Sequence, residues 1–199
     1  TAGTNIMLDD GIWSQERTLN SRAFKWWGNG STWLKGDSIA MTIYNETFYF
    51  LKITSYNNCP NVDFYYCYCE NINAAFPAAF KMEFCIVKSS HITYCGSIFK
   101  GVNNCILFYC TATAPQQPTA LNTFYNNIII GKDPGFTGIF ADYNNYTTLS
   151  IPTTNGANSH SINDASTEQT VADYFNNYAL GDYTAKAGSK NLGAGFNRH

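Results

Sequence analysis

The sequence predicts an all-β fold in which one chain winds into a solenoid of stacked, parallel strand coils. Between positions 57 and 130, an aromatic residue or Asn is repeatedly followed by Cys or Asn, as in Asn58-Cys59, Tyr66-Cys67, Phe84-Cys85, Tyr94-Cys95, Asn104-Cys105, Tyr109-Cys110 and Asn126-Asn127. Five of the seven cysteines also fall at steps of ten, in the series Cys59 to Cys69 and Cys85 to Cys95 to Cys105. A repeat of about twenty β-rich residues is typical of a solenoid, because each repeat must stack on its neighbours to bury its apolar face.

Coils of strands explain the repeat better than leucine-rich repeats of similar length, because the repeat positions hold Phe, Tyr, Ile, Val and Cys in place of spaced leucines. Stacked strands lie ~4.8 Å apart, so equivalent side chains form ladders, and Asn at a turn can bond to the Asn of the next coil. Asn-Asn pairs begin at positions 57, 103, 126, 144 and 176. These positions are the expected turns.

The length and composition indicate a single domain, residues 1–199, of six to eight coils. We expect the first coils in 1–56, the central Cys and Asn ladder coils in 57–130, and the last coils with an irregular C-terminal cap in 131–199. Charged residues are 13% and the net charge is −2, which argues against binding to nucleic acid. No run of 18 apolar residues is present, so no membrane insertion is expected.

The cysteines are expected to be buried thiols that act as small hydrophobic side chains. Seven is an odd number, and the spacing lacks the CxxC pattern of zinc and redox sites. The Cβ vectors of stacked cysteines run parallel and do not converge, which favours free thiols over a disulfide network. No metal site is predicted from these residues.

The N-terminal third supplies the first strands. Residues 1–13 form a short apolar strand ended by Asp10-Gly11, a dipeptide that supplies the positive φ of a tight turn. Between 39 and 53 we expect two strands that each bury one face. The inward residues would be Ile39, Met41 and Ile43 in the first strand and Phe48, Phe50 and Ile53 in the second.

Two short strands should meet at the turn Gly28-Asn29-Gly30 within residues 24–34. Trp26 and Trp27 are adjacent, so strand alternation sends them to opposite faces. The exposed one is either a platform on which a sugar ring stacks or a residue that packs under a loop. Trp33 lies at the end of the same segment.

The central coils are expected in five segments, Val62–Cys69, Met82–Val87, Ile92–Phe99, Val102–Cys110 and Phe124–Ile130. Residues 74–79 and 112–120 contain Pro77, Pro115 and Pro118, and proline cannot occupy a central strand. These two segments are therefore expected to leave the coil as loops, the elements that carry specificity in solenoids.

Three segments resemble motifs of one known family. Residues 1–13 resemble the opening "Gly-Asp-Thr-Ile-x-Leu-x-x-Gly-x-Tyr" of right-handed parallel β-helix proteins of the pectate-lyase-like superfamily, with Asn5 and Trp13 as departures. Residues 155–162 resemble its "Gly-x-Asp-x-His-Ser-Ile" stretch, and 181–195 its "Gly-Asp-Tyr-x-Leu-x-x-Gly-Ser-Pro-Ala-Ile-x-Ala-Gly" ending. The resemblance implies a single-stranded right-handed β-helix. The superfamily includes lyases, hydrolases, phage tailspikes and inert scaffolds, so it does not select an activity.

A polysaccharide lyase of that superfamily implies a basic residue beside acids that bind calcium and a uronate. Asp63 and Glu83 are twenty residues apart, as expected for adjacent coils, and Lys81 is near, so these three are the catalytic candidates. A glycoside hydrolase would use the same two carboxylates at ~5 to ~9.5 Å. The alternative is that all three are solvated side chains on an outer face. Calcium is a cofactor only of the lyase, and otherwise none is expected.

Three functions stay open at this stage. The preferred one is an extracellular, secreted or virion-surface protein that binds a polysaccharide or cell-surface glycan through aromatic and Asn-rich faces, with Trp26, Trp33, Tyr65 and Tyr68 as glycan-binding candidates. The second is a polysaccharide lyase or glycosidase. The third is a structural tailspike or fibre segment that forms a homotrimer.

Overall fold

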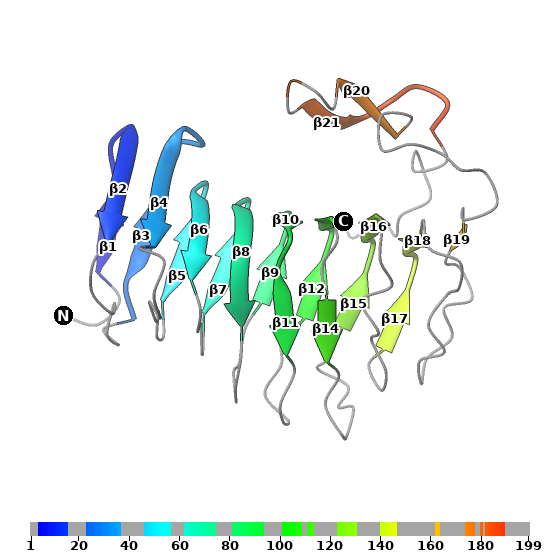
Figure 1. Ribbon diagram of the computed structural model, residues 1–199, viewed down its shortest axis with the longest axis horizontal. Coiled ribbons are helices and arrows are strands. Elements are labelled where there is room, and N and C mark those ends of the chain that lie inside the picture. Colours follow the sequence, from blue (N-terminus) through cyan, green and yellow to red (C-terminus); the bar gives the residue numbers. More distant parts are fainter. Residues whose placement is uncertain are drawn as a thin grey trace.

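The computed structural model describes residues 4–15, 23–36, 46–56, 62–74, 81–93, 101–108, 111–113, 123–130, 140–146, 162–163, 174–177, 180 and 182–189. Their regular elements are β-strands, stacked in a long row in Figure 1. Within these ranges no helix has the length and apolar character needed to cross a membrane.

Two parallel sheets run along this row. Sheet A has eight strands in the order β1 (Asn5–Met7), β3 (Lys25–Trp27), β5 (Thr47–Tyr49), β7 (Asp63–Tyr65), β9 (Lys81–Glu83), β12 (Gly101–Asn103), β15 (Thr123–Tyr125) and β17 (Phe140–Asp142). Sheet B runs through β2 (Gly11–Gln15), β4 (Thr32–Gly36), β6 (Lys52–Tyr56), β8 (Tyr68–Ala74), β10 (Ile86–Lys88), β13 (Ile106–Phe108), β16 (Ile128–Ile130), β18 (Asn145–Tyr146) and β19 (Ile162–Asn163). Beside it, β11 (His91–Thr93) pairs with β8 and with β14 (Thr111–Thr113).

The chain alternates between the sheets, so a strand of sheet A and the next strand of sheet B form one level of the stack. Partners on adjacent levels are between 16 residues apart, from Phe48 to Phe64, and 22 residues apart, from Trp26 to Phe48. All pairs in both sheets are parallel. The predicted all-β parallel solenoid with a repeat of about twenty residues is therefore confirmed.

The interior is built from ladders of apolar side chains. The middle residues of β5, β7, β9 and β12 point inward, and these residues, Phe48, Phe64, Met82 and Val102, have no exposed surface. Facing them from sheet B are the buried residues Leu34, Ile53, Cys69, Val87, Leu107 and Ile129. Burying one such large side chain stabilises the fold by about 1.5–3 kcal/mol. Among the described residues, this apolar core extends from the level of Leu34 to that of Ile129.

A two-residue corner joins sheet A to sheet B. Its first, outward residue has a φ of 54° to 57° at six successive levels, at Phe50, Tyr66, Phe84, Asn104, Asn126 and Tyr143. This left-handed conformation turns the chain sharply, and the next residue points inward. The predicted phrase of an aromatic residue or Asn followed by Cys or Asn is this corner. Its copies at 58–59, 94–95 and 109–110 lie outside the described residues.

The corner corrects two predictions. Phe50 was expected to share the buried face of Phe48 and Ile53, but it is 40% exposed, because the left-handed residue breaks the alternation of the strand. The cysteines of the predicted series at steps of ten also occupy two different positions in the coil, not one. Cys67 and Cys85 occupy the inner corner, whereas Cys69 pairs in register with Ile53 and Val87 inside sheet B. Cys59, Cys95 and Cys110, like the expected strand with Ile39, Met41 and Ile43, lie outside the described residues.

The inner corner carries thiols and then amides. Cys67, Cys69, Cys85 and Cys105 are free and buried, as predicted. The thiols of Cys67 and Cys85 donate to the carbonyls of Phe48 and Phe64, at 3.5 and 3.4 Å. Burial raises the pKa of the Cys67 and Cys69 thiols well above the usual value, so both stay protonated at neutral pH.

Asn127 continues the inner corner with stronger hydrogen bonds. Its Nδ2 donates to the Val102 carbonyl at 2.9 Å, and its Oδ1 accepts from the Cys105 amide at 2.9 Å. Asn127 Nδ2 and the Asn127 backbone amide also donate to Asn144 Oδ1, at 3.0 and 2.9 Å. The predicted bonding between Asn residues of adjacent coils is therefore present in this part of the stack.

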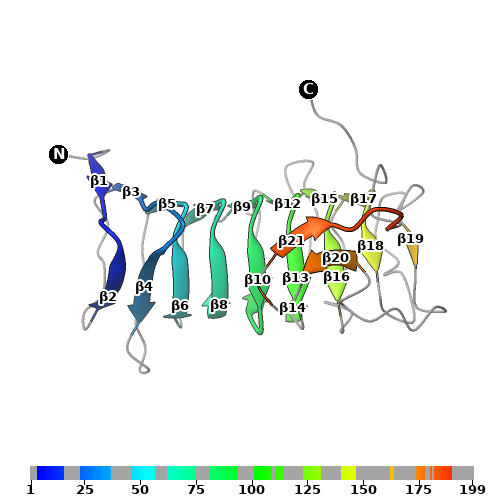
Figure 2. The same cartoon turned by 90° about the horizontal axis from the view of Figure 1, so that it is seen from above.

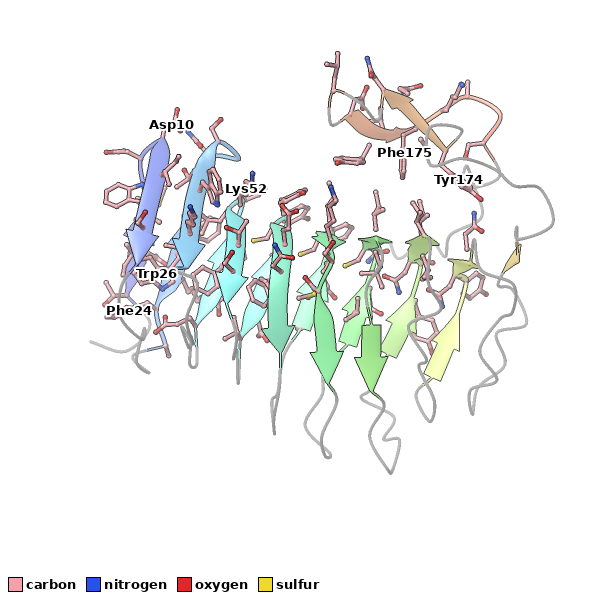
Figure 3. The ribbon with its side chains drawn as sticks, viewed as in Figure 1. Asp10, Phe24, Trp26, Lys52, Tyr174 and Phe175 are labelled. Carbon is pink, nitrogen blue, oxygen red and sulfur yellow. The ribbon has the colours of Figure 1, made fainter. Side chains whose placement is uncertain are left out.

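A C-terminal hairpin, β20 (Phe175–Asn177) and β21 (Asp182–Ala185), lies outside sheet B above β13 and β16 (Figures 1 and 2). Tyr174 and Phe175 form a buried cluster with Ile130, and Phe175 lies on the side of the hairpin that faces the sheet (Figure 3). Packed against this cluster are Ile86, Ile106, Ile128 and Tyr183. The described part of the tail thus covers an isoleucine column on the outer face of sheet B.

Candidate functional site

Two ladders of aromatic rings run along the outside of the solenoid. In the corner ladder, Tyr66 stacks on Phe50 at 5.0 Å and on Phe84 at 4.9 Å between ring centroids. In the sheet ladder, Tyr49 stacks on Trp27 at 4.0 Å and on Tyr65 at 5.1 Å. The register of parallel strands places these rings one above the other, and the left-handed corner sends Phe50, Tyr66 and Phe84 outward.

Stacking decides which aromatic surface solvent can reach. Within the corner ladder the rings are nearly parallel, with interplanar angles of 10° and 4°, so both faces of Tyr66 are covered by its neighbours. Phe84 ends the ladder, because the next corner residue is Asn104. One face of Phe84 is therefore covered by Tyr66, while the other faces the level of Asn104. Phe84 is 48% exposed and Tyr66 is 50% exposed, so solvent reaches the edges of both rings to a similar extent.

An open pocket of about 460 Å³ lies at this end of the corner ladder. It is lined by Phe84, Cys85, Ile86, Asn104, Ile106, Asp182, Tyr183 and Thr184. The first five residues come from the β9–β10 and β12–β13 corners and strands, and the last three from β21. This volume is in the usual range of ligand pockets, ~300 to ~1,000 Å³.

The hairpin holds its wall of the pocket through apolar contacts. Phe175 and Tyr183 meet edge to face at 5.5 Å, and Tyr183 also packs against the cluster that covers the isoleucine column. Strand alternation then places Asp182 and Thr184 on the opposite face of β21 from Tyr183. Those two side chains therefore lie on the side of the hairpin away from sheet B, where Asn176 Nδ2 also donates to the Thr184 hydroxyl at 2.9 Å.

The polar groups of the pocket are ordered by hydrogen bonds. Asp182 Oδ1 accepts from the backbone amide of Thr184 at 3.0 Å and from its hydroxyl at 2.5 Å. These two bonds, the side-chain bond first, lower the pKa of Asp182, so it is ionised at neutral pH. On the solenoid side, Asn104 Oδ1 accepts from Asn126 Nδ2 at 3.0 Å, which orients the Asn104 amide.

The four predicted glycan-binding residues do not form one site. Trp26 belongs to the inner ladder, where its ring stacks on Phe48 at 6.2 Å and its indole N–H donates to buried Glu46 at 3.1 Å. It lies beside Phe24 near the N-terminal end of the stack (Figure 3). Trp27 takes the outer face in its place. Tyr65 is in the sheet ladder.

Trp33 and Tyr68 lie together on the outer face of sheet B, on either side of Lys52. The Lys52 ammonium is 4.1 Å from the Trp33 ring centroid and 5.5 Å from that of Tyr68. The position of Lys52 on sheet B is labelled in Figure 3. Each ring thus has a cation–π contact with a side chain of the protein itself.

The three catalytic candidates do come together on the outer face of sheet A. Asp63 pairs in register with Lys81, and Lys81 Nζ forms an ion pair with Glu83 Oε1 at 2.8 Å. Burial lowers the pKa of Lys81, but the hydrogen bond and charge of Glu83 outweigh it, and the net shift is upward. A general base must be unprotonated. This ion pair therefore does not favour Lys81 as a base at neutral pH.

The described residues provide no set of ligands for a metal ion. Within the placed residues, no group of three or more His, Cys, Asp or Glu side chains is arranged to hold a metal ion. The calcium expected for a lyase therefore has no candidate site there.

The pocket residues Phe84, Asn104 and Asp182 were missed as a set by sequence reasoning. The corner phrase held part of the signal, since Phe84-Cys85 and Asn104-Cys105 are consecutive copies in which an outward ring is followed by an outward amide. Gly181-Asp182-Tyr183-Thr184 was interpreted only as a cap motif. Nothing in the sequence indicated that this motif lies beside Phe84.

Comparisons with protein-family models, curated proteins and solved structures return no match for this chain. The resemblance to the pectate-lyase-like superfamily is thus a matter of the three sequence motifs alone. Function is inferred below from the solenoid and its pocket.

Proposed function

We propose that this protein is a carbohydrate-binding β-solenoid that holds a sugar ring in the pocket beside Phe84. The observation that supports it is the pocket in which Phe84, the last ring of the corner ladder, lies beside the Asn104 amide and the residues of β21. A sugar ring has apolar C–H faces and a rim of hydroxyl groups, so it needs this combination of surfaces.

Each group has a role in this proposal. The Phe84 ring packs against the C–H face of the sugar. The Asn104 amide donates to a ring or hydroxyl oxygen.

The sequence motifs supply the rest of the proposal, which concerns the protein as a whole. The protein is a right-handed β-helix of six to eight coils, of the pectate-lyase-like type. It is secreted or lies on a virion surface, and its ligand is a polysaccharide or a cell-surface glycan. The general rule that about 98% of crossovers between parallel strands are right-handed favours this handedness. Glycan cleavage and homotrimer formation stay predictions from the sequence.

Two matched variants test the binding site. Phe84→Ala and Phe50→Ala each remove one end of the corner ladder, at positions with similar exposure, 48% and 40%, and the same left-handed φ. Binding to a panel of immobilised and soluble glycans is measured by affinity retention and by ligand-observed NMR. Phe84→Ala should weaken binding at least about tenfold, while Phe50→Ala should bind as the wild type.

The thermal unfolding of both variants is the control. Each variant loses its stacking on Tyr66, and Phe50 also has a tilted ring contact with Trp27 at 6.3 Å, so Phe50→Ala should be destabilised at least as much as Phe84→Ala. Equal glycan binding by Phe84→Ala and the wild type would overturn the proposal. So would equal loss of binding in both variants, because the effect would then follow the ladder and not the pocket.

A further inference from the structure

We infer that the pocket binds the acetyl group of an acetylated sugar, with its methyl over Ile86 and Ile106 and its carbonyl oxygen at the Asn104 amide. This inference rests on the proposed glycan-binding function, and it names the class of ligand. Acetamido sugars and O-acetylated sugars both carry the methyl and carbonyl groups that the inference requires.

Three of the residues that line the pocket offer it no polar side-chain group. The Thr184 hydroxyl bonds to Asp182 and Asn176 on the side of the hairpin away from sheet B. The Cys85 thiol points into the core, where it donates to the Phe64 carbonyl at 3.4 Å. Recognition therefore depends on the other lining side chains.

Those side chains form two pairs on adjacent levels, with one ring above them. Phe84 and Asn104 are the outward corner residues of the two levels. Ile86 and Ile106 follow them in the chain and pair in register on the outer face of sheet B. Tyr183 approaches from the hairpin and packs against the same cluster as the two isoleucines. Ile86, Ile106 and Tyr183 are each half-buried, so the hairpin leaves part of their apolar surface open to the pocket.

The Asn104 amide supplies hydrogen-bond donors beside this apolar surface. Its Oδ1 accepts from Asn126 Nδ2 at 3.0 Å, and its Nδ2 has no hydrogen-bond partner among the described residues. An amide Nδ2 carries two N–H donors, so the site requires acceptor oxygens from a ligand. The carbonyl oxygen of an acetyl group is such an acceptor. The second N–H is left for the ring or hydroxyl oxygen of the sugar.

The apolar surface next to Asn104 favours a methyl group over a hydroxyl group. A hydroxyl placed over Ile86 and Ile106 would give up hydrogen bonds to water and find no partner on these side chains, which is unfavourable. A methyl group in the same place covers apolar surface that water contacts in the free protein, which is favourable. An acetyl group brings the methyl and the carbonyl together, as the neighbouring isoleucines and amide require.

The experiment compares sugars that differ only in the acyl group. Glucosamine and galactosamine oligomers whose nitrogen carries an acetyl or a formyl group, and the corresponding glucose and galactose oligomers with or without O-acetyl groups, are titrated into the full chain. Calorimetry and ligand-observed NMR measure binding. We expect at least one acetylated oligomer to bind, and its formyl or unacylated partner to bind about tenfold more weakly, because one apolar methyl group is lost. The O-acetylated members show whether an ester can replace the amide as the source of the acetyl group.

Ile106→Thr and Ile128→Thr are the matched variants. Both isoleucines pack against the hairpin cluster, but only Ile106 lines the pocket. Threonine keeps the β-branched shape and replaces an apolar group by a hydroxyl. Ile106→Thr should reduce the preference for acetyl to less than about threefold, while Ile128→Thr should keep it. Thermal unfolding of both variants measures the packing that each has lost.

Equal binding of an acetylated oligomer and its unacetylated partner would overturn the inference. So would an equal loss of preference in the two variants, because the effect would then follow the packing of the hairpin and not the pocket. If the unselective binding is lost in Phe84→Ala, the proposed glycan site still holds. If neither these oligomers nor any glycan of the wider panel binds, the proposed function itself fails.

Discussion

The corner between the sheets is built in two ways along the same solenoid. On the levels from β5 to β10 its outward residues are the stacked rings of Phe50, Tyr66 and Phe84. From β12 to β16 they are Asn104 and Asn126, joined by an amide hydrogen bond of 3.0 Å. The backbone is the same in both parts, with a φ of 55° to 57° at all five residues.

The aromatic part and the Asn part of the corner show two ways in which a repeat can stabilise a strained backbone. A left-handed residue other than Gly costs about 1–2 kcal/mol, and Asn reduces this cost through local hydrogen bonds. The aromatic half offsets it with ring stacking, at about 0.5–1.5 kcal/mol for each pair. Because the two solutions use different side chains, a boundary exists where they meet. The pocket is at this boundary, between Phe84 and Asn104.

The largest expected effect comes from the inner side of the corner. Asn127→Ala should destabilise the protein by about 2–4 kcal/mol, because it removes the acceptor of the buried Cys105 amide and the donor to the Val102 carbonyl. Cys67→Ala, in the thiol half, should cost only about 1 kcal/mol, since a thiol is a weak donor. Urea unfolding of the two variants checks the difference, and equal losses would contradict it.

Stability of the aromatic half is tested next. Tyr66→Ala removes the ring between Phe50 and Phe84 and should destabilise by about 1–3 kcal/mol, the sum of two stacked pairs. Tyr66→Asn should recover part of this loss, because Asn tolerates the left-handed backbone. Thermal unfolding compares the two variants. A Tyr66→Asn protein less stable than Tyr66→Ala would show that the amide solution does not transfer to this level.

Moving the boundary between the ring ladder and the Asn corner by one level should abolish glycan binding without unfolding the chain. Asn104→Phe extends the corner ladder by one ring, which places an aromatic side chain against the second face of Phe84 and fills the pocket. We expect glycan binding to fall at least about tenfold, while stability changes by no more than about 1.5 kcal/mol. Asn126→Phe, one level further, is the control. Retained binding in Asn104→Phe would mean that the sugar does not lie against Phe84.

The smallest effect is on the titration of Asp182. Its pKa is lowered in the folded protein, so the stability that it contributes is present above its unfolded pKa of 3.8 and is lost as the pH falls through the folded value. Carboxyl-detected NMR should give a titration midpoint below 3.8, and Thr184→Val should move it upward. An unchanged midpoint in that variant would exclude the hydroxyl bond as the cause.

Much of the solenoid was predictable because its signal is local and repeated. Tyr66-Cys67 and Phe84-Cys85 recur with the chain's period, and a period of about twenty in β-rich segments has few alternatives. The protonated, buried state of Cys67 and Cys69 also follows from the sequence, since stacked coils place equivalent residues in the interior. Hydrophobic periodicity determined these features.

Only the tertiary structure decided which side chains face outward and what lies beside them. Partners are 16 to 22 residues apart, as from Phe48 to Phe64 and from Trp26 to Phe48, so a strict step of ten could not place the cysteines. The left-handed corner turns Phe50 outward, and the alternation of apolar and polar residues in the sequence does not reveal this turn. The pocket needs β21 beside Phe84, and this placement depends on the hairpin packing on Ile86, Ile106 and Ile128. Contacts between segments so far apart in the chain arise from packing, which a pattern of neighbouring residues does not encode.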